Sequence, residues 1–134
     1  MSYKLLRDLS IGNYKEGIVP DKEVWEIKWA HAKLTTTATK GDRLLVMSAF
    51  LPDDPETPLA RTFSPIIQRE NTARRYQMFP GISSVLPVLD VSCIILPNTP
   101  MLLSGWKFTL TDFYNVDVND HLELRSTVIQ VTKE

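Results

Sequence analysis

Two neighbouring segments rich in bulky and β-branched residues dominate the hydrophobic pattern of this chain. Residues 24–39 read VWEIKWAHAKLTTTAT, and residues 43–51 read RLLVMSAFL. Such side chains suit a half-buried pleated surface, so both segments are predicted to be β-strands. Gly41 lies between them and can supply the positive φ of a short turn. The pattern therefore predicts a β-hairpin.

The hydrophobic faces of these two strands are unusual. In the first strand, apolar residues begin on odd positions, at Trp25 and Ile27, and then move to even positions, at Ala32 and Leu34. A one-residue change of phase predicts a β-bulge or a strand covered on both faces. Residues 44–51 are apolar on both faces, which is typical of an interior strand or of one covered by a subunit partner.

The rest of the chain adds further strand signals. Strands are predicted at residues 60–66, about 90–96, 102–113 and 121–131, while residues 68–79 form either a short helix or an irregular strand. Within 102–113, Trp106, Phe108 and Leu110 alternate with polar residues, which predicts one face in the core and one in water.

The loops complete the fold prediction. Residues 52–58 contain three prolines and three carboxylates and are predicted to form a surface loop. Six or seven short strands at this spacing predict an all-β fold, specifically an antiparallel β-sandwich with a jelly roll as the expected topology. Residues 1–20 are expected to be an N-terminal arm, and residues 21–134 a single β-sandwich domain.

Composition and charge narrow the classes of function. The 134 residues fit one domain. Fifteen basic and 16 acidic residues give a net charge of −1, so no nucleic-acid partner is expected, because phosphate binding favours a basic excess. The first 17 residues lack the apolar core of a signal peptide, and no stretch approaches the ~20 apolar residues of a membrane span. We expect synthesis in the cytosol and no membrane partner.

Histidine and cysteine residues are few and scattered. His31, His121 and Cys93 show none of the spacings of a zinc site. Cys93 lies in the apolar run VSCIIL and is expected to be a small buried hydrophobe. His31 is expected to be a packed or rim histidine. His121 could form a pH-sensitive pair with Asp120, but the favoured interpretation is a solvated turn. We therefore expect no cofactor and no metal.

The acidic segment 112–120 has two interpretations. Asp112, Asp117, Asn119 and Asp120 place several oxygen donors close together, and calcium takes 6–8 oxygen ligands. However, the spaced pattern of a calcium loop is missing. The favoured interpretation is an Asx-rich turn between two strands.

Other polar and aromatic clusters give weaker signals. The carboxylates within residues 53–56 share one loop and do not resemble the separated pair of a glycosidase. The serines lack a G-x-S-x-G elbow, and the basic residues within 69–75 are expected to be a solvated face. Trp25 and Trp29 are expected to face the same side, in the core or an interface, or as a sugar-stacking platform. No catalytic residue is predicted.

Four segments together resemble a known group of proteins. They are V-P-x-x-x-V-W-E-I-x-W-A-H-x-x-L-T-T-T-A-T-x-G-D-R at 19–43, T-A-R-R-Y-x-x-F-P-G at 72–81, I-L-P-x-x-P-M-L-L-x-G-W at 95–106, and D-V-N-D-x-L-E-L-R at 117–125. Their order and spacing are similar to those of small proteins encoded among the virion-structural genes of tailed bacteriophages. Asp42 replaces the usual Asn and Ser104 the usual Ala, and Asn119 stands in the final acidic turn.

The resemblance implies a component of the virion and supplies no catalytic residues. We expect a capsid decoration (cement) protein that binds the head surface as a homo-oligomer, with a trimer favoured. Its partners would be other copies of itself and the major capsid protein or another virion protein. The alternatives are a carbohydrate- or host-surface-binding module of a tail assembly, and an enzyme with an unrecognised site. The N-terminal arm is expected to reach a neighbour or the capsid.

Overall fold

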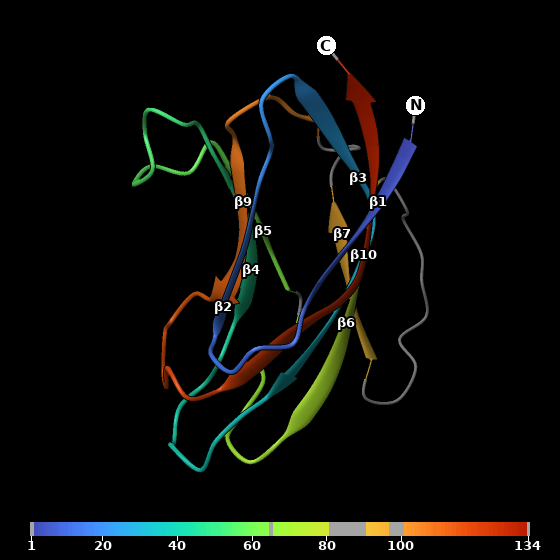
Figure 1. Ribbon diagram of the computed structural model, residues 1–134. Coiled ribbons are helices and arrows are strands. Elements are labelled where there is room, and N and C mark those ends of the chain that lie inside the picture. Colours follow the sequence, from blue (N-terminus) through green and yellow to red (C-terminus); the bar gives the residue numbers. More distant parts are fainter. Residues whose placement is uncertain (1, 65, 81–90, 97–100, 134) are drawn as a thin grey trace.

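The protein is all-β over the residues that its computed structural model describes, 2–64, 66–80, 91–96 and 101–133, with the backbone alone at 78–80 and 91–96. Within these described residues, ten strands form two sheets. The sheets lie face to face as two layers (Figure 1). No helix occurs among the described residues, which confirms the prediction of an all-β, two-sheet protein at this level.

The two sheets differ in size. Sheet A contains, in order, β1 (Ser2–Asp8), β10 (His121–Lys133), β3 (Glu23–Thr35), β6 (Ala73–Pro80) and β7 (Val91–Leu96), with β8 (Met101–Leu102) also paired to β3. Sheet B contains, in order, β2 (Tyr14–Ile18), β9 (Lys107–Asp112), β4 (Leu45–Phe50) and β5 (Ala60–Phe63). These strand pairs are antiparallel except β6 with β7, which is parallel. The ambiguous segment 68–79 thus contributes a strand.

The predicted hairpin of β3 and β4 does not form. β3 pairs with strands of sheet A, and β4 pairs with β9 and β5 in sheet B. Gly41 does have a positive φ, 145°, but the segment around it crosses from one sheet to the other. Its backbone is bonded elsewhere: the Thr36 N–H donates to the Thr72 carbonyl, and Arg43 exchanges two hydrogen bonds with Gln68.

The predicted bulge is present in β3. Ile27 pairs with Ile129, whereas Trp29 pairs with Val128, so Lys28 is the additional residue on β3. The bulge reverses the faces beyond it. Trp25 is therefore buried in the core, while Trp29 lies on the outer face of sheet A. The expectation that both tryptophans face the same side was wrong.

One hydrophobic core lies between the sheets. The inward face predicted for Trp106, Phe108 and Leu110 is confirmed, with Trp106 half-buried. The other buried residues include Trp25, Ile27, Leu45 and Met47. They come from both sheets. Burial of each such side chain stabilises the fold by roughly 1.5–3 kcal/mol, so this shared core holds the two layers together.

The N-terminal segment is part of both sheets of its own chain, unlike the separate arm that was expected. Ser2 pairs with Val131 in sheet A, and Tyr14 pairs with Thr111 in sheet B. The inward positions of β2 are Lys15 and a glycine, so this segment lacks the alternation of apolar and polar residues that predicts a strand. The buried Lys15 ammonium donates to the Ser10 carbonyl at 2.6 Å and to its hydroxyl at 2.9 Å.

Candidate functional site

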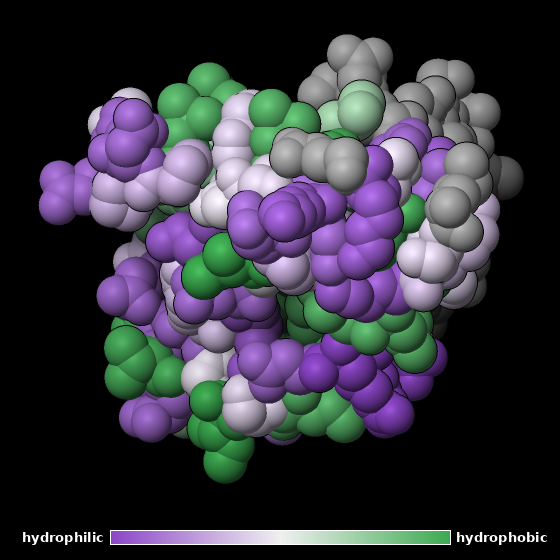
Figure 2. All heavy atoms as spheres, turned by 45° about the horizontal axis from the view of Figure 1, so that its top comes forward, coloured by the Kyte–Doolittle hydropathy of each residue, from purple (hydrophilic) through white to green (hydrophobic). Residues whose placement is uncertain are grey.

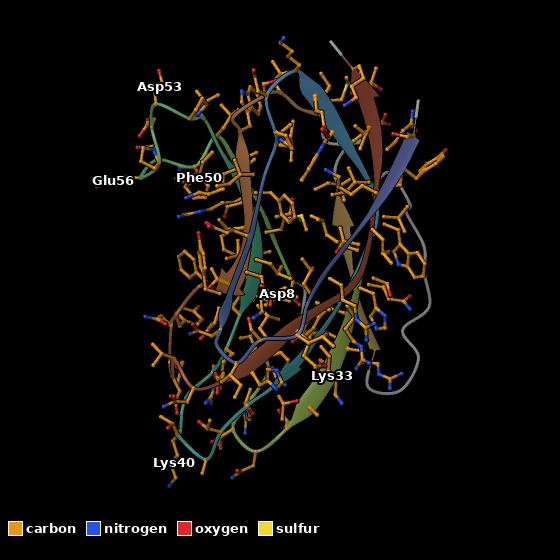
Figure 3. The ribbon with its side chains drawn as sticks, in the orientation of Figure 1. Asp8, Lys33, Lys40, Phe50, Asp53 and Glu56 are labelled. Atoms are coloured by element: carbon orange, nitrogen blue, oxygen red, sulfur yellow. The ribbon has the colours of Figure 1, made fainter. Side chains whose placement is uncertain are left out.

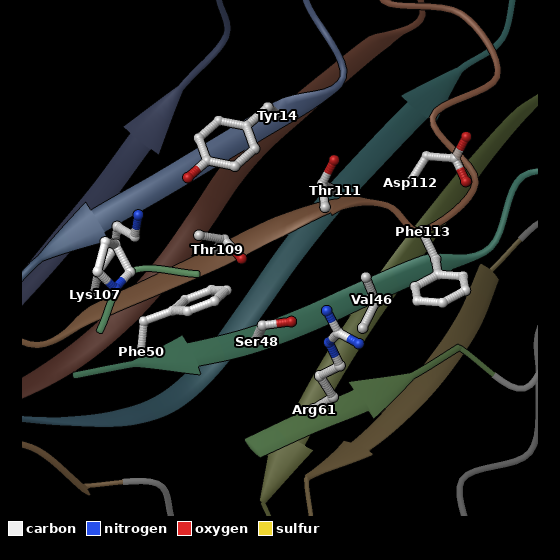
Figure 4. Close-up of a pocket in the computed structure, with 11 residues that line it drawn as sticks. Tyr14, Val46, Ser48, Phe50, Arg61, Lys107, Thr109, Thr111, Asp112 and Phe113 are labelled. Atoms are coloured by element: carbon white, nitrogen blue, oxygen red, sulfur yellow. The ribbon is translucent and has the colours of Figure 1, made fainter. Parts of the chain in front are cut away.

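A groove lies on the outer face of sheet B (Figure 4). Because strand side chains alternate between faces, β4 and β9 give Leu45 and Phe108 to the core and present their other residues here. The hollow has a volume of about 280 Å³ and is lined by Tyr14, Val46, Ser48, Phe50, Pro55, Arg61, Lys107, Thr109, Thr111, Asp112 and Phe113. The second apolar face predicted for residues 44–51 is thus part of this groove.

Two hydroxyls form its floor. Ser48 on β4 and Thr109 on β9 are direct cross-strand partners. Their residues are only 4% and 3% exposed, yet neither hydroxyl makes a hydrogen bond to any residue that the structure describes. Neither is sealed from the groove. By contrast, the Thr111 hydroxyl donates to the Asn13 carbonyl at 2.9 Å. Two hydroxyls are therefore available to a ligand.

Aromatic rings and cations flank this floor. The Lys107 ammonium lies 5.1 Å from the centre of the Phe50 ring. The Arg61 guanidinium lies 5.5 Å from the centre of the Phe113 ring. Tyr14 contributes a third ring from β2 (Figure 4). Each cation is held near a ring by the attraction between positive charge and the π face, so apolar and positive surfaces adjoin.

The acidic groups at the groove are already occupied. Asp112 accepts backbone hydrogen bonds from Leu44, Tyr114 and Val116 at 2.9, 3.1 and 2.9 Å. At the rim, the Tyr14 phenol donates to Glu16 at 2.9 Å. Burial and this hydrogen bond raise the pKa of Tyr14 to about 12, so the phenol is neutral at physiological pH. Arg61 and Lys107 are the cations that a ligand in the groove would meet, and the Lys107 ammonium lies 4.0 Å from the rim carboxylate of Glu16.

Among the described residues that line the groove, no nucleophile is hydrogen-bonded to a base. Its lining contains neither histidine nor cysteine. Nucleophilic catalysis requires an adjacent base, and Ser48 lacks a hydrogen-bonded one among the described residues. A hydroxyl floor between aromatic walls suits a polyhydroxylated ligand, because most small-molecule sites combine apolar walls with a few convergent polar groups.

A second polar cluster, the loop lock, joins the β3–β4 and β9–β10 connections. It consists of Thr37, Thr39, Arg43, Asp117 and Asp120. The Arg43 side chain is fully buried, and its Nε and Nη2 donate to the two Asp120 oxygens at 2.9 and 3.2 Å. Its Nη1 donates to the carbonyls of Thr39 and Gly41, both at 2.8 Å. The T-T-T-A-T-x-G-D-R and D-V-N-D segments therefore meet in a structural contact.

The acidic turn belongs to this lock. Asp117 accepts hydrogen bonds from the hydroxyls of Thr37 and Thr39 at 2.5 and 2.6 Å, and from the Asn119 N–H at 2.9 Å. The geometry favours the Asx-turn interpretation, because protein donors occupy the carboxylate oxygens. The described residues hold no group of three or more His, Cys, Asp or Glu arranged for a metal.

Replacing Asp117 by asparagine tests this turn through pH. The two hydroxyls and the Asn119 N–H lower the pKa of Asp117 from 3.8 to about 2. The stabilisation from its charged form is thus present above about pH 4 and is lost as the pH falls towards 2. We expect Asp117→Asn to lower the Tm at pH 7 and the difference from wild type to shrink between pH 4 and 2. A difference that stays constant over this range would contradict the assignment; Asp53→Asn is the control.

The remaining candidate residues do not converge on a site. His121 Nε2 lies 3.0 Å from the Leu9 carbonyl, while its neighbour Asp120 pairs with Arg43. His31 lies on the outer face of sheet A, where burial and nearby arginines lower its pKa. The Cys93 side chain lies outside the described residues. The carboxylates of 53–56 are exposed at the tip of the β4–β5 loop (Figure 3).

In comparisons with known proteins, the chain matches no family model, no curated protein and no solved structure at a significant level. Within the described part of the chain, no helix has the length and hydrophobicity to cross a membrane.

Sequence reasoning did not identify the groove. Two of its signals were visible: the polar alternation of Lys107, Thr109 and Thr111, and the second apolar face of residues 44–51. Their meeting depends on β4 lying beside β9, which are separated by about sixty residues and are not joined by a turn. No local pattern specifies that pairing.

Proposed function

We propose that this chain is a structural protein of a tailed-phage virion, specifically a decoration protein that binds the head as a homo-oligomer, with a trimer favoured. The resemblance of its four segments supports the virion assignment. The loop lock is also consistent with a structural role, because two of the four resembling segments meet there in a contact that stabilises the fold.

We infer a jelly-roll topology from the strand pairing. β1 pairs with β10, β2 with β9, β3 with β6 and β4 with β5, as in a long two-stranded ribbon folded over on itself. Rolling that ribbon gives the orders β1-β10-β3-β6 and β2-β9-β4-β5, while β7 and β8 are additions in the β6–β9 connection. Double-sheet jelly rolls occur among viral capsid and lectin domains.

The observation that carries the oligomer proposal is an apolar row across the outer face of sheet A. Leu5 pairs with Val128, which pairs with Trp29 on the next strand. Leu5 is 63% exposed, and Tyr3 on the same face of β1 is 66% exposed. β1 is also an edge strand. An edge strand with no further strand beside it in the described residues, next to apolar side chains, favours pairing with another subunit.

Viewed with the top of Figure 1 turned forward, the surface shows separate hydrophobic patches among hydrophilic side chains (Figure 2). Closed cyclic symmetry covers such patches without leaving open edges. A stable interface should bury more than roughly 1,000 Å² in total. We expect the outer face of β1, β10 and β3 to contribute part of this area.

Light scattering at micromolar concentration tests the oligomer. We expect a mass three times the 15.3 kDa of the chain, and a shift towards monomer for Leu5→Glu because the charge would be buried in the interface. Leu59→Glu is the matched control, since Leu59 is 56% exposed on the other side of the molecule. A 15.3 kDa wild-type monomer would contradict the oligomer.

The virion assignment has its own test. Purified particles of the source phage should contain the protein at a fixed copy number relative to the major capsid protein. Its absence from purified virions would refute the decoration function.

A carbohydrate-binding module of a tail or receptor-binding assembly is the second candidate. The groove on sheet B favours it, because two available hydroxyls lie between aromatic rings. Direct binding of a glycan, in a protein that is not incorporated into heads, would favour this candidate over the first.

A further inference from the structure

We propose that the groove on the outer face of sheet B is a binding site for a sugar residue that carries a carboxylate, such as a uronic or sialic acid unit of a surface glycan. This inference deepens the second candidate function and does not depend on the decoration function. Its support comes from the floor, the walls and the charges of the groove.

The floor supplies the first reason. The Ser48 and Thr109 residues are only 4% and 3% exposed, yet their hydroxyls open into the groove and have no hydrogen-bond partner among the described residues. Each hydroxyl can donate one hydrogen bond and accept two. Side by side on adjacent strands, they match the vicinal hydroxyls of a sugar, which also donate and accept.

The walls supply the second reason. A pyranose ring has apolar C–H faces, and the rings of Phe50, Phe113 and Tyr14 offer apolar area around the floor (Figure 4). Aromatic side chains bury much surface at low conformational cost. The volume of about 280 Å³ lies near the lower end of ligand sites, roughly 300–1,000 Å³. The groove therefore suits a short saccharide more than a large ligand.

The charges supply the third reason. Arg61 and Lys107 both line the groove, and a guanidinium can bind a carboxylate through two parallel hydrogen bonds. Asp112 also lines the groove, but three backbone N–H groups donate to its carboxylate and partly offset its negative charge. Glu16 lies at the rim, with its carboxylate 4.0 Å from the Lys107 ammonium. Arg61 has no carboxylate partner among the described residues, so it is the cation that favours an anionic sugar over a neutral one.

Titration of the ¹⁵N-labelled protein with 3′-sialyllactose, trigalacturonate and lactose tests the site. We expect at least one acidic saccharide to bind with a Kd of about 1 mM or tighter, with the largest amide shifts in β4 and β9. Binding should be about tenfold or more weaker for lactose, as loss of a charge-assisted hydrogen bond implies. Equal binding of lactose, or shifts confined to sheet A, would overturn the proposal.

Three substitutions separate the contributions. Thr109→Val should weaken binding by about three- to tenfold, the effect of one hydrogen bond, without lowering the Tm, because its hydroxyl has no partner among the described residues. Arg61→Met should abolish the preference for acidic saccharides, and Phe50→Ala should weaken all binding. Thr132→Val and Lys33→Met, both on sheet A, are the matched controls and should bind as wild type.

Two further outcomes would also overturn the proposal. If none of the three saccharides shifts any amide at 10 mM, the groove is not such a site. If Phe50→Ala dissociates an oligomer, the groove is instead a contact between subunits. Virion incorporation is measured separately, so a failure of glycan binding leaves the decoration function to be judged by its own test.

Discussion

Replacing Arg43 by methionine is expected to lower the free energy of unfolding by about 3–5 kcal/mol, the cost of breaking a buried ion pair by removal of one partner. Both Arg43 and Asp120 side chains are 0% exposed. The substitution would leave the Asp120 carboxylate buried with the Thr37 N–H as its remaining donor among these contacts, at 2.9 Å. The Thr39 and Gly41 carbonyls would lose their donor as well.

Thermal unfolding followed by circular dichroism measures this effect. For a chain of this length, the expected loss corresponds to a fall in Tm of about 10–15 °C. Arg69→Met is the matched control: its guanidinium is 80% exposed and lies 4.0 Å from Asp42, and exposed ion pairs contribute about 0–1 kcal/mol. If both variants melt within two or so degrees of each other, the loop lock does not stabilise the fold as described.

Replacing Phe108 by alanine is expected to destabilise the protein by about 3–5 kcal/mol, through lost burial and the cavity that remains. Phe108 is 1% exposed in the core shared by the sheets. Domains are stable by only about 5–15 kcal/mol, so this is a large fraction of the total. Chemical denaturation should show a lower midpoint with an unchanged m-value. Phe63→Ala, at a 42% exposed aromatic position of the same sheet, is the control.

The glycine opposite Phe108 provides a second measurement. A Cβ on Gly17 would lie 2.3 Å from the Phe108 ring, so Gly17→Ala is expected to cost about 1–3 kcal/mol by overpacking. In a Phe108→Leu background part of that space is freed. The two changes should therefore couple favourably by about 0.5–3 kcal/mol in a double-mutant cycle. Additive effects would show that the ring does not rest on this glycine.

The two candidate functions use opposite faces of the molecule. The apolar row with Leu5 lies on sheet A, and the groove with Phe50 lies on sheet B (Figures 1 and 4). A subunit contact on one face leaves the other open. An oligomer with outward-facing grooves would bind a glycan multivalently, and linked sites can strengthen millimolar binding greatly without any new contact. Both tests can therefore succeed on one protein.

The alternation of apolar and polar residues within single segments predicted most of the strands and the faces that they turn to the core. The bulge near Lys28 was readable because a change of phase in a period-two pattern can be seen within one segment. The inward alternation of Trp106, Phe108 and Leu110 was readable for the same reason. Where the inward positions of β2 carry Lys15 and Gly17 in place of apolar residues, no alternation predicts a strand, and residues 1–20 were therefore expected to be an arm.

The tertiary structure decided which strands are neighbours. β3 and β4 are adjacent in sequence but belong to different sheets, and the Arg43–Asp120 pair joins residues 77 positions apart. The groove likewise exists only because β2, β9, β4 and β5 lie side by side. Period-two alternation fixes which side of a strand faces the core, but the same alternation is compatible with many partners. Burial of one shared core and the pairing of every strand with its neighbours select among them, and both are properties of the whole chain.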